Sequence, residues 1–69
     1  MPLSMVDAGV PYTIKKIGGK EDTRRHLENL GFVVGGIVTV VSEINGSLIV
    51  NVKESIVAIG KDMANKIMV

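Results

Sequence analysis

The sequence predicts a mainly β fold, a small, partly open barrel of about five strands with one short helix inserted after the first strand. Two Val/Ile-rich runs, 37–42 and 47–53, flank Asn45-Gly46, a pair typical of β-hairpins because both residues tolerate positive φ. In residues 20–30 the inward-facing positions recur at the spacing of a helix instead. Hydrophobic residues make up 46% of the chain and are nearly all short aliphatics, which suit the narrow interior of a small barrel.

The first strand is predicted over Tyr12–Ile17, after Pro11, which cannot donate a ladder hydrogen bond and therefore favours a strand start or a sheet edge. Its alternation of apolar and polar residues is imperfect, so a bend or bulge is expected. Gly18-Gly19 ends the strand.

The helix is predicted over Lys20–Leu30. Glu21 and Asp22 occupy the first turn, where acids complement the helix dipole. Thr23, Leu27 and Leu30 are expected to make one inward stripe. Gly31 is expected to be the left-handed stop, with Phe32 folding back onto Leu27 or Leu30.

The central hairpin follows a second turn at Gly35-Gly36, and its hydrophobic pattern selects the register. A three-residue loop with Gly46 left-handed pairs Val40 with Val50 and Val38 with Val52, which gathers the valines on one surface. A two-residue loop would pair Val40 with Asn51 instead. We therefore expect the three-residue loop and a bulge at Gly46.

The remaining elements are short. Glu54-Ser55 is predicted as a tight connection into Ile56–Ile59, a third strand of the central sheet that Gly60 ends. A single helical turn is expected within 61–66, with Asp62 as its cap. Residues 67–69 are expected to form a last strand beside the first one.

Length, charge and composition exclude several classes of protein. The chain is predicted to be one domain, 1–69, without cysteine and therefore without disulfides or thiolate metal sites. The net charge of +1 provides no electrostatic footprint for nucleic acid. No apolar run is long enough to cross a bilayer, and the N-terminus lacks the pattern of a signal peptide. We expect a cytoplasmic protein.

The order of these elements and of the residues between them resembles the FeoA family (ferrous iron transport protein A). The matching residues are Pro2-Leu3, Gly9, Ile14, Ile17-Gly18-Gly19, the run from Arg24 to Phe32, Gly35, Val38-Thr39-Val40, Gly46, Leu48 to Val52, Val57-Ala58-Ile59, Ala64 and Ile67-Met68-Val69. The resemblance implies an SH3-like barrel. One departure is Val34, where the family often has proline.

The resemblance also implies a function. Members of this family are small cytoplasmic proteins without catalytic activity that act beside FeoB, the membrane ferrous-iron transporter with a cytosolic GTP-binding domain. The same domain occurs fused to iron-responsive repressors and to the transporter itself.

No arrangement of residues predicts catalysis or a cofactor. The four serines have no motif around them, and His26 is the only histidine. Asp22 and His26 are helical neighbours, but one imidazole with carboxylates is a weak basis for a metal, so none is assigned. Neither glycine pair has the Lys-Ser/Thr of a phosphate loop.

An interaction surface is the remaining prediction. In the chosen register the outer face of the hairpin carries Ile37, Val41 and Ile49, an exposed aliphatic patch unless something covers it. The cover is either the chain's own segment Leu3–Val6 or a partner, including a second copy of the protein. Under the second alternative, Ile49→Asp should abolish association and leave the barrel folded.

The helix provides a second part of that surface. Arg24 and Arg25 form a small basic patch, and with Phe32 they are predicted to contact the partner next to the hairpin face. A solvated, salt-bridged helix face is the alternative interpretation of the two arginines.

The leading hypothesis is a non-enzymatic accessory protein that docks onto the cytosolic part of a FeoB-type transporter and meets the membrane only through it. One alternative is a small barrel that binds nucleic acid, against which stand the near-neutral charge and the presence of only two aromatic residues. The other is an accessory metal-sensing domain of an iron-responsive repressor.

Overall fold

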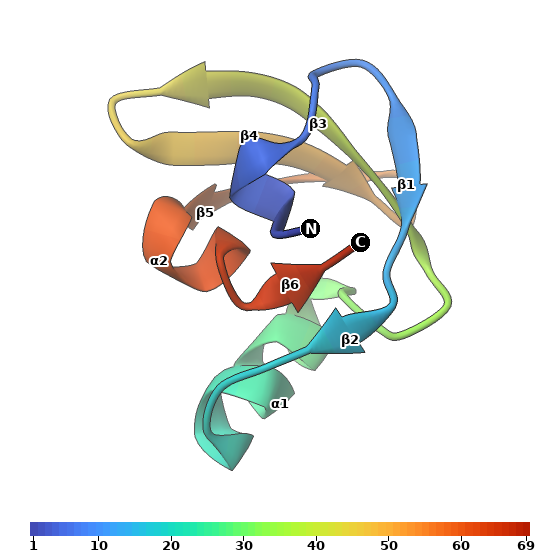
Figure 1. The fold of residues 1–69 in the computed structure, drawn as a ribbon, viewed down its shortest axis with the longest axis vertical. Coiled ribbons are helices and arrows are strands. Elements are labelled where there is room, and N and C mark those ends of the chain that lie inside the picture. Colours follow the sequence, from blue (N-terminus) through green and yellow to red (C-terminus); the bar gives the residue numbers. More distant parts are fainter.

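The computed structural model describes all residues, 1–69, and confirms a mainly β fold of small-barrel type (Figure 1). Six strands form two sheets, a four-stranded sheet in the order β1-β3-β4-β5 and a two-stranded sheet of β2 and β6. The elements are the 3-10 helix η1 (Leu3–Met5), β1 (Pro11–Thr13), β2 (Lys16–Ile17), the α-helix α1 (Glu21–Leu30), β3 (Ile37–Ile44), β4 (Ser47–Val52), β5 (Ser55–Gly60), the short α-helix α2 (Lys61–Ala64) and β6 (Ile67–Met68). The barrel is not closed, because β5 has no strand on its far side.

The predicted first strand is divided into two, which explains the sixth strand. β1 pairs antiparallel with β3, whereas β2 pairs antiparallel with β6. Between them the Ile14 amide donates to the Gly36 carbonyl at 2.9 Å, and the Lys15 amide donates to the Met68 carbonyl at 2.8 Å. This break lets Ile14 and Ile17 both enter the core, although regular alternation would place them on opposite faces.

The predicted pairing of the central hairpin is confirmed, but the predicted loop is wrong. Val38 lies opposite Val52 and Val40 opposite Val50. The loop has two residues, Asn45 (φ 49°) and Gly46 (φ 82°), because Ile44 pairs directly with Ser47. The extra residue is Val41, which lies between the paired residues Val40 and Ser42 and forms a β-bulge.

The helix α1 ends as predicted. Gly31 is left-handed (φ 109°), and the Phe32 amide turns back to donate to the Leu27 carbonyl at 2.9 Å. Leu27 is buried, while Thr23 and Leu30 are half-buried, so the inward stripe is confirmed.

The C-terminal elements are also confirmed, with one correction. β5 joins the central sheet beside β4, and β6 lies beside β2. The helical turn is α2, but its N-cap is Gly60, and no side chain caps it. Asp62 lies inside the first turn of α2, so its predicted role as cap was wrong.

The core is entirely hydrophobic and lies on the inner side of the four-stranded sheet. Fourteen hydrophobic residues are buried, and no polar or charged residue is. The N-terminal segment contributes to this core: η1 contacts α2, and Leu3 is completely buried. Leu3 therefore packs on the inside of the barrel and does not cover the outer face of the hairpin, while Met5 is 71% exposed.

Candidate partner-binding surface

The four-stranded sheet has one uncovered face. Inner residues of β3 and β4 alternate with outer ones, and the ladder places Thr39, Asn51 and Ile56 in one row across the sheet. Ile37 and Ile56 are 55% and 62% exposed. We call this surface the outer sheet face, and its residues are Ile37, Thr39, Ile49, Asn51, Ile56 and Ala58.

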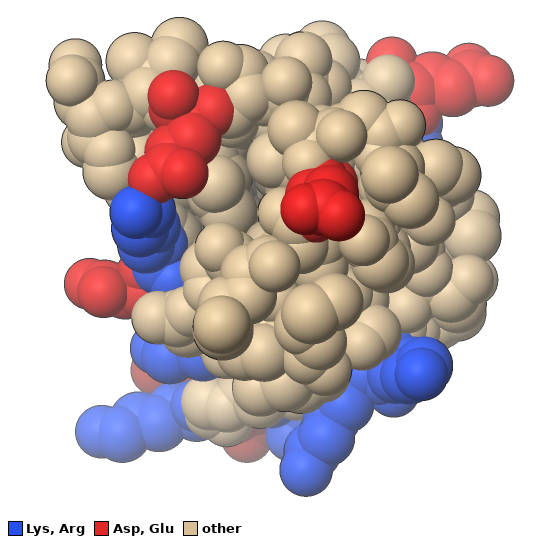
Figure 2. Space-filling view, turned by 45° about the horizontal axis from the view of Figure 1, so that its top comes forward, with Lys and Arg blue, Asp and Glu red and all other residues tan.

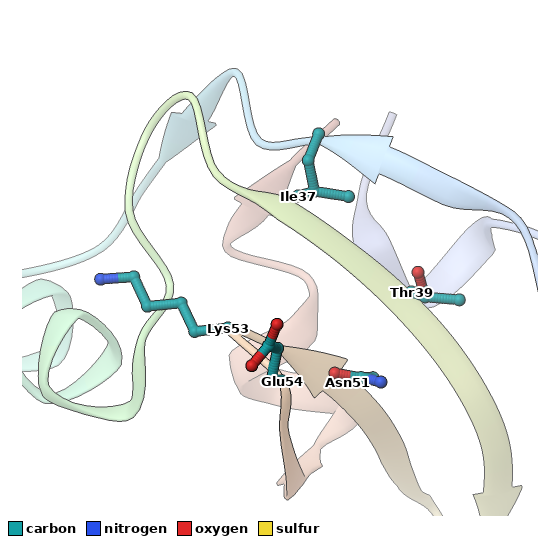
Figure 3. A pocket seen from close by; sticks show the side chains of 5 residues that line it. All are labelled: Ile37, Thr39, Asn51, Lys53 and Glu54. Atoms are coloured by element: carbon teal, nitrogen blue, oxygen red, sulfur yellow. The ribbon is translucent and has the colours of Figure 1, made fainter.

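A shallow hollow of about 310 Å³ lies on this face, between the start of β3 and the β4–β5 turn (Figure 3). Its lining combines one aliphatic, two neutral polar and two charged side chains: Ile37, Thr39, Asn51, Lys53 and Glu54. Such a surface offers an apolar contact beside hydrogen-bonding groups and one charge of each sign.

The turn that borders this hollow is built from unusual residues. Lys53 (φ 49°) and Glu54 (φ 63°) both have left-handed backbone, where residues other than glycine, asparagine and aspartate are uncommon. The other hairpin of the same chain solves the same geometry with Asn45-Gly46. Backbone strain of this kind is often retained where the side chains have a function.

Lys53 also links the hollow to the end of α1. The aliphatic stem of Lys53 passes over Gly31, with its Cδ atom 3.6 Å from the position that a Cβ of Gly31 would take. The predicted connection at Glu54-Ser55 exists but lies one residue earlier, at Lys53-Glu54, because Val52 pairs directly with Ser55.

A second hollow, the basic cleft, lies between β2, α1 and the loop after the helix. It measures about 380 Å³, and three cationic side chains line it with only one carboxylate. The lining residues are Lys15, Lys16, Ile17, Arg24, Glu28, Val33 and Val34. Lys and Arg also gather toward the lower edge of the face in Figure 2. An acidic surface is the complementary partner for this cleft.

The structure separates the predicted partner-binding residues into different places. Ile37 and Val41 are exposed and Ile49 is half-buried on or beside the outer sheet face. Arg24 lines the basic cleft, and Arg25 donates to Glu21 on the helix surface at 3.0 Å. The two hollows share no lining residue, so Ile37 and Arg24 line different hollows.

Phe32 does not belong to any surface. Its side chain is fully buried in the core, so its predicted contact with a partner was wrong. The reason is the turn at Gly31, which directs the chain back under the helix immediately before Phe32.

Two further features bear on the chemistry of the molecule. No cluster of three or more His, Cys, Asp or Glu side chains is placed to hold a metal ion, and His26 lies exposed on α1. Neither helix has the length and hydrophobicity needed to span a bilayer.

Comparison with known proteins gives a consistent picture. A model of the FeoA domain matches residues 1–69. A Methanocaldococcus jannaschii protein provisionally named Fe(2+) transport protein A is 34% identical over 68 residues, which are 99% of this chain and 83% of that protein. The crystal structure of an iron uptake regulatory protein, FeoA, is 31% identical and superposes with a TM-score of 0.88 over 97% of this chain and 89% of its own.

A third relative shows the fold alone. The zinc complex of Stenotrophomonas maltophilia FeoA is 23% identical, with a TM-score of 0.84 over 99% of this chain and 87% of its own. That protein is described as a prokaryotic SH3 domain protein and suggested to be a ferrous iron transport activating factor.

Proposed function

Because the chain belongs to the FeoA family, we propose that it is a non-enzymatic accessory protein of ferrous iron uptake that docks onto the cytosolic domain of a FeoB-type transporter. It would act in the cytoplasm and meet the membrane only through that transporter. The observation that carries the proposal is the match over the whole chain, including a relative named for Fe(2+) transport.

The outer sheet face supports docking rather than catalysis. Its hollow is open and shallow, and it is lined by Ile37 and Glu54 together with Lys53, whose side chain extends away from the other labelled residues (Figure 3). Exposed aliphatic groups next to polar ones are typical of transient protein interfaces. Asn-Gly would fold more easily at the strained turn. The presence of Lys53 and Glu54 there instead is in keeping with a function for their side chains.

Docking alone does not regulate a transporter. A bound protein shifts a conformational equilibrium only if its affinity differs between the two states, and a tenfold difference corresponds to about 1.4 kcal/mol. We therefore propose that the docked protein distinguishes the nucleotide states of the transporter domain. The basic cleft is the second candidate contact, suited to an acidic patch on that domain.

The experiment is a binding titration with the purified cytosolic domain of the transporter from the same organism. The domain is prepared without nucleotide, with GDP and with a non-hydrolysable GTP analogue, and binding is followed by calorimetry. We expect binding that differs at least about tenfold between states. Equal affinity in all states would contradict regulation, and no binding in any state would contradict docking.

The same titration with single-stranded RNA tests the nucleic-acid alternative. No aromatic side chain lines either hollow, so stacked bases would lack the platform that RNA-binding barrels use. We expect no salt-sensitive binding.

A further inference from the structure

The edge strand β5 is unprotected, and this feature is independent of the transporter. β5 (Ser55–Gly60) is the last strand of the four-stranded sheet. Its residues, Ser-Ile-Val-Ala-Ile-Gly, include no charge and no proline, and its ladder with β4 has no bulge. Native edge strands are usually blunted by one of those devices, because an open edge pairs with other strands.

The opposite edge of the same sheet is protected. β1 has only three residues and begins with Pro11, which has no N–H to offer. β5 has six residues and no such feature. The contrast between the two edges of one sheet indicates that the β5 edge is available for pairing with another strand.

The geometry of the β4–β5 hairpin determines which backbone N–H and C=O groups of β5 point away from β4. Lys53 and Glu54 form a two-residue turn, so Val52 and Ser55 flank it as a hydrogen-bonded pair. Hydrogen-bonded and non-hydrogen-bonded pairs alternate along an antiparallel ladder. Val57 lies two residues after Ser55, so its N–H and C=O groups also face β4. The N–H and C=O groups of Ile56 and Ala58 face away from the sheet, and none of the hydrogen bonds outside the ladders involves them.

We propose that β5 pairs antiparallel with β5 of a second copy of the protein, so that two four-stranded sheets become one continuous sheet. A two-fold axis at Val57 places Ile56 of one copy opposite Ala58 of the other, and all outward N–H and C=O groups of these residues are satisfied. It also places the two half-buried Val57 side chains against each other. The strand is uncharged, so this self-pairing brings no like charges together.

The test is amide hydrogen exchange of the intact protein at low and high concentration, together with its mass in solution. In the monomer the Ile56 and Ala58 amides are open to water, whereas the Val57 and Ile59 amides are bonded to β4. We expect a two-chain species at high concentration, in which exchange at Ile56 and Ala58 slows at least about tenfold. A single-chain mass up to millimolar concentration would overturn the proposal, as would a dimer in which those two amides stay unprotected.

Two variants of one exposed residue extend the test. Ala58→Pro removes an outward N–H that β4 does not use, and Ala58→Thr retains it on a good strand former. The proline variant should remain a folded monomer, and the threonine variant should dimerise like the parent. If Ala58→Pro fails to fold, Ile56→Lys, which places a charge beside each copy's partner strand, should weaken the dimer instead. A dimer unaffected by these edge changes contradicts the proposal, and protection of the edge only by the transporter domain would identify a different occupant.

Discussion

The Phe32 amide donates to the Leu27 carbonyl at 2.9 Å, and the side chains of both residues are completely buried. This backbone hydrogen bond closes the end of the helix and brings Phe32 into the barrel core. It depends on Gly31, whose φ of 109° lies outside the range that other residues readily adopt. This relationship removes Phe32 from the partner surface and makes it part of the scaffold.

Phe32→Ala should therefore lower stability and not act through a lost partner contact. Deleting a buried phenyl ring costs about 3–5 kcal/mol, and a chain of this size has little more to lose. Urea unfolding followed by circular dichroism measures the change. Phe32→Leu should lose clearly less, and an alanine variant as stable as the parent would contradict the buried position.

Gly31→Ala should destabilise the protein by about 1–3 kcal/mol because of backbone strain. A methyl group there meets only ordinary contacts with Lys53 and Val52, so crowding is not the cause. The matched control is Gly18→Ala, at a glycine without positive φ whose added methyl would lie 3.6 Å from the Lys66 carbonyl. Thermal unfolding should show a clearly lower midpoint for the first variant than for the second.

Deletion of Val41 should leave the fold intact. With the bulge residue gone, the two-residue loop and the pairs Val38–Val52 and Val40–Val50 fit one regular ladder. The loss of stability should be small, on the order of 1 kcal/mol. Cross-strand NOEs between the paired valines are the measurement.

The control for that deletion removes Asn51, which is exposed and opposite Thr39. Val50 and Val52 then become sequence neighbours and cannot both face the core. This variant should not fold. If it folds as well as the Val41 deletion, the register does not depend on the bulge.

Ile37→Asp should reduce affinity for the transporter domain at least about tenfold. Ile44→Asp is the matched control, since both isoleucines lie on β3 and both are 55% exposed, but only Ile37 lines the hollow. This pair tests the contact better than Ile49→Asp, because Ile49 is half-buried and a charge there would also lower stability. Equal loss of affinity in the two variants would indicate that the hollow is not the contact.

Replacing the strained turn should separate stability from docking. The double change Lys53→Asn with Glu54→Gly supplies the residues that a tight hairpin prefers, and it should raise stability by about 1 kcal/mol. It should also weaken docking, because both charges leave the hollow. A more stable protein with unchanged affinity would show that the charges have no role in the contact.

The sequence by itself determined the elements whose pattern is local. Gly31 predicted the end of α1, and the valines at 38, 40, 50 and 52 predicted one another as partners, because only one pairing buries them all. The last strand was predicted beside the first, and β2 and β6 confirm it.

Only the tertiary structure decided how the register is achieved and which residues reach the surface. A bulge at Val41 and a bulge at Gly46 bury the same valines, so hydrophobic pattern cannot distinguish them, and the ladder places the extra residue at Val41. The structure also decides between the two places predicted for Phe32, against Leu27 or Leu30 and on the partner surface, in favour of the first. The position of Lys53 over Gly31 depends on a contact between segments distant in sequence, which no local propensity encodes.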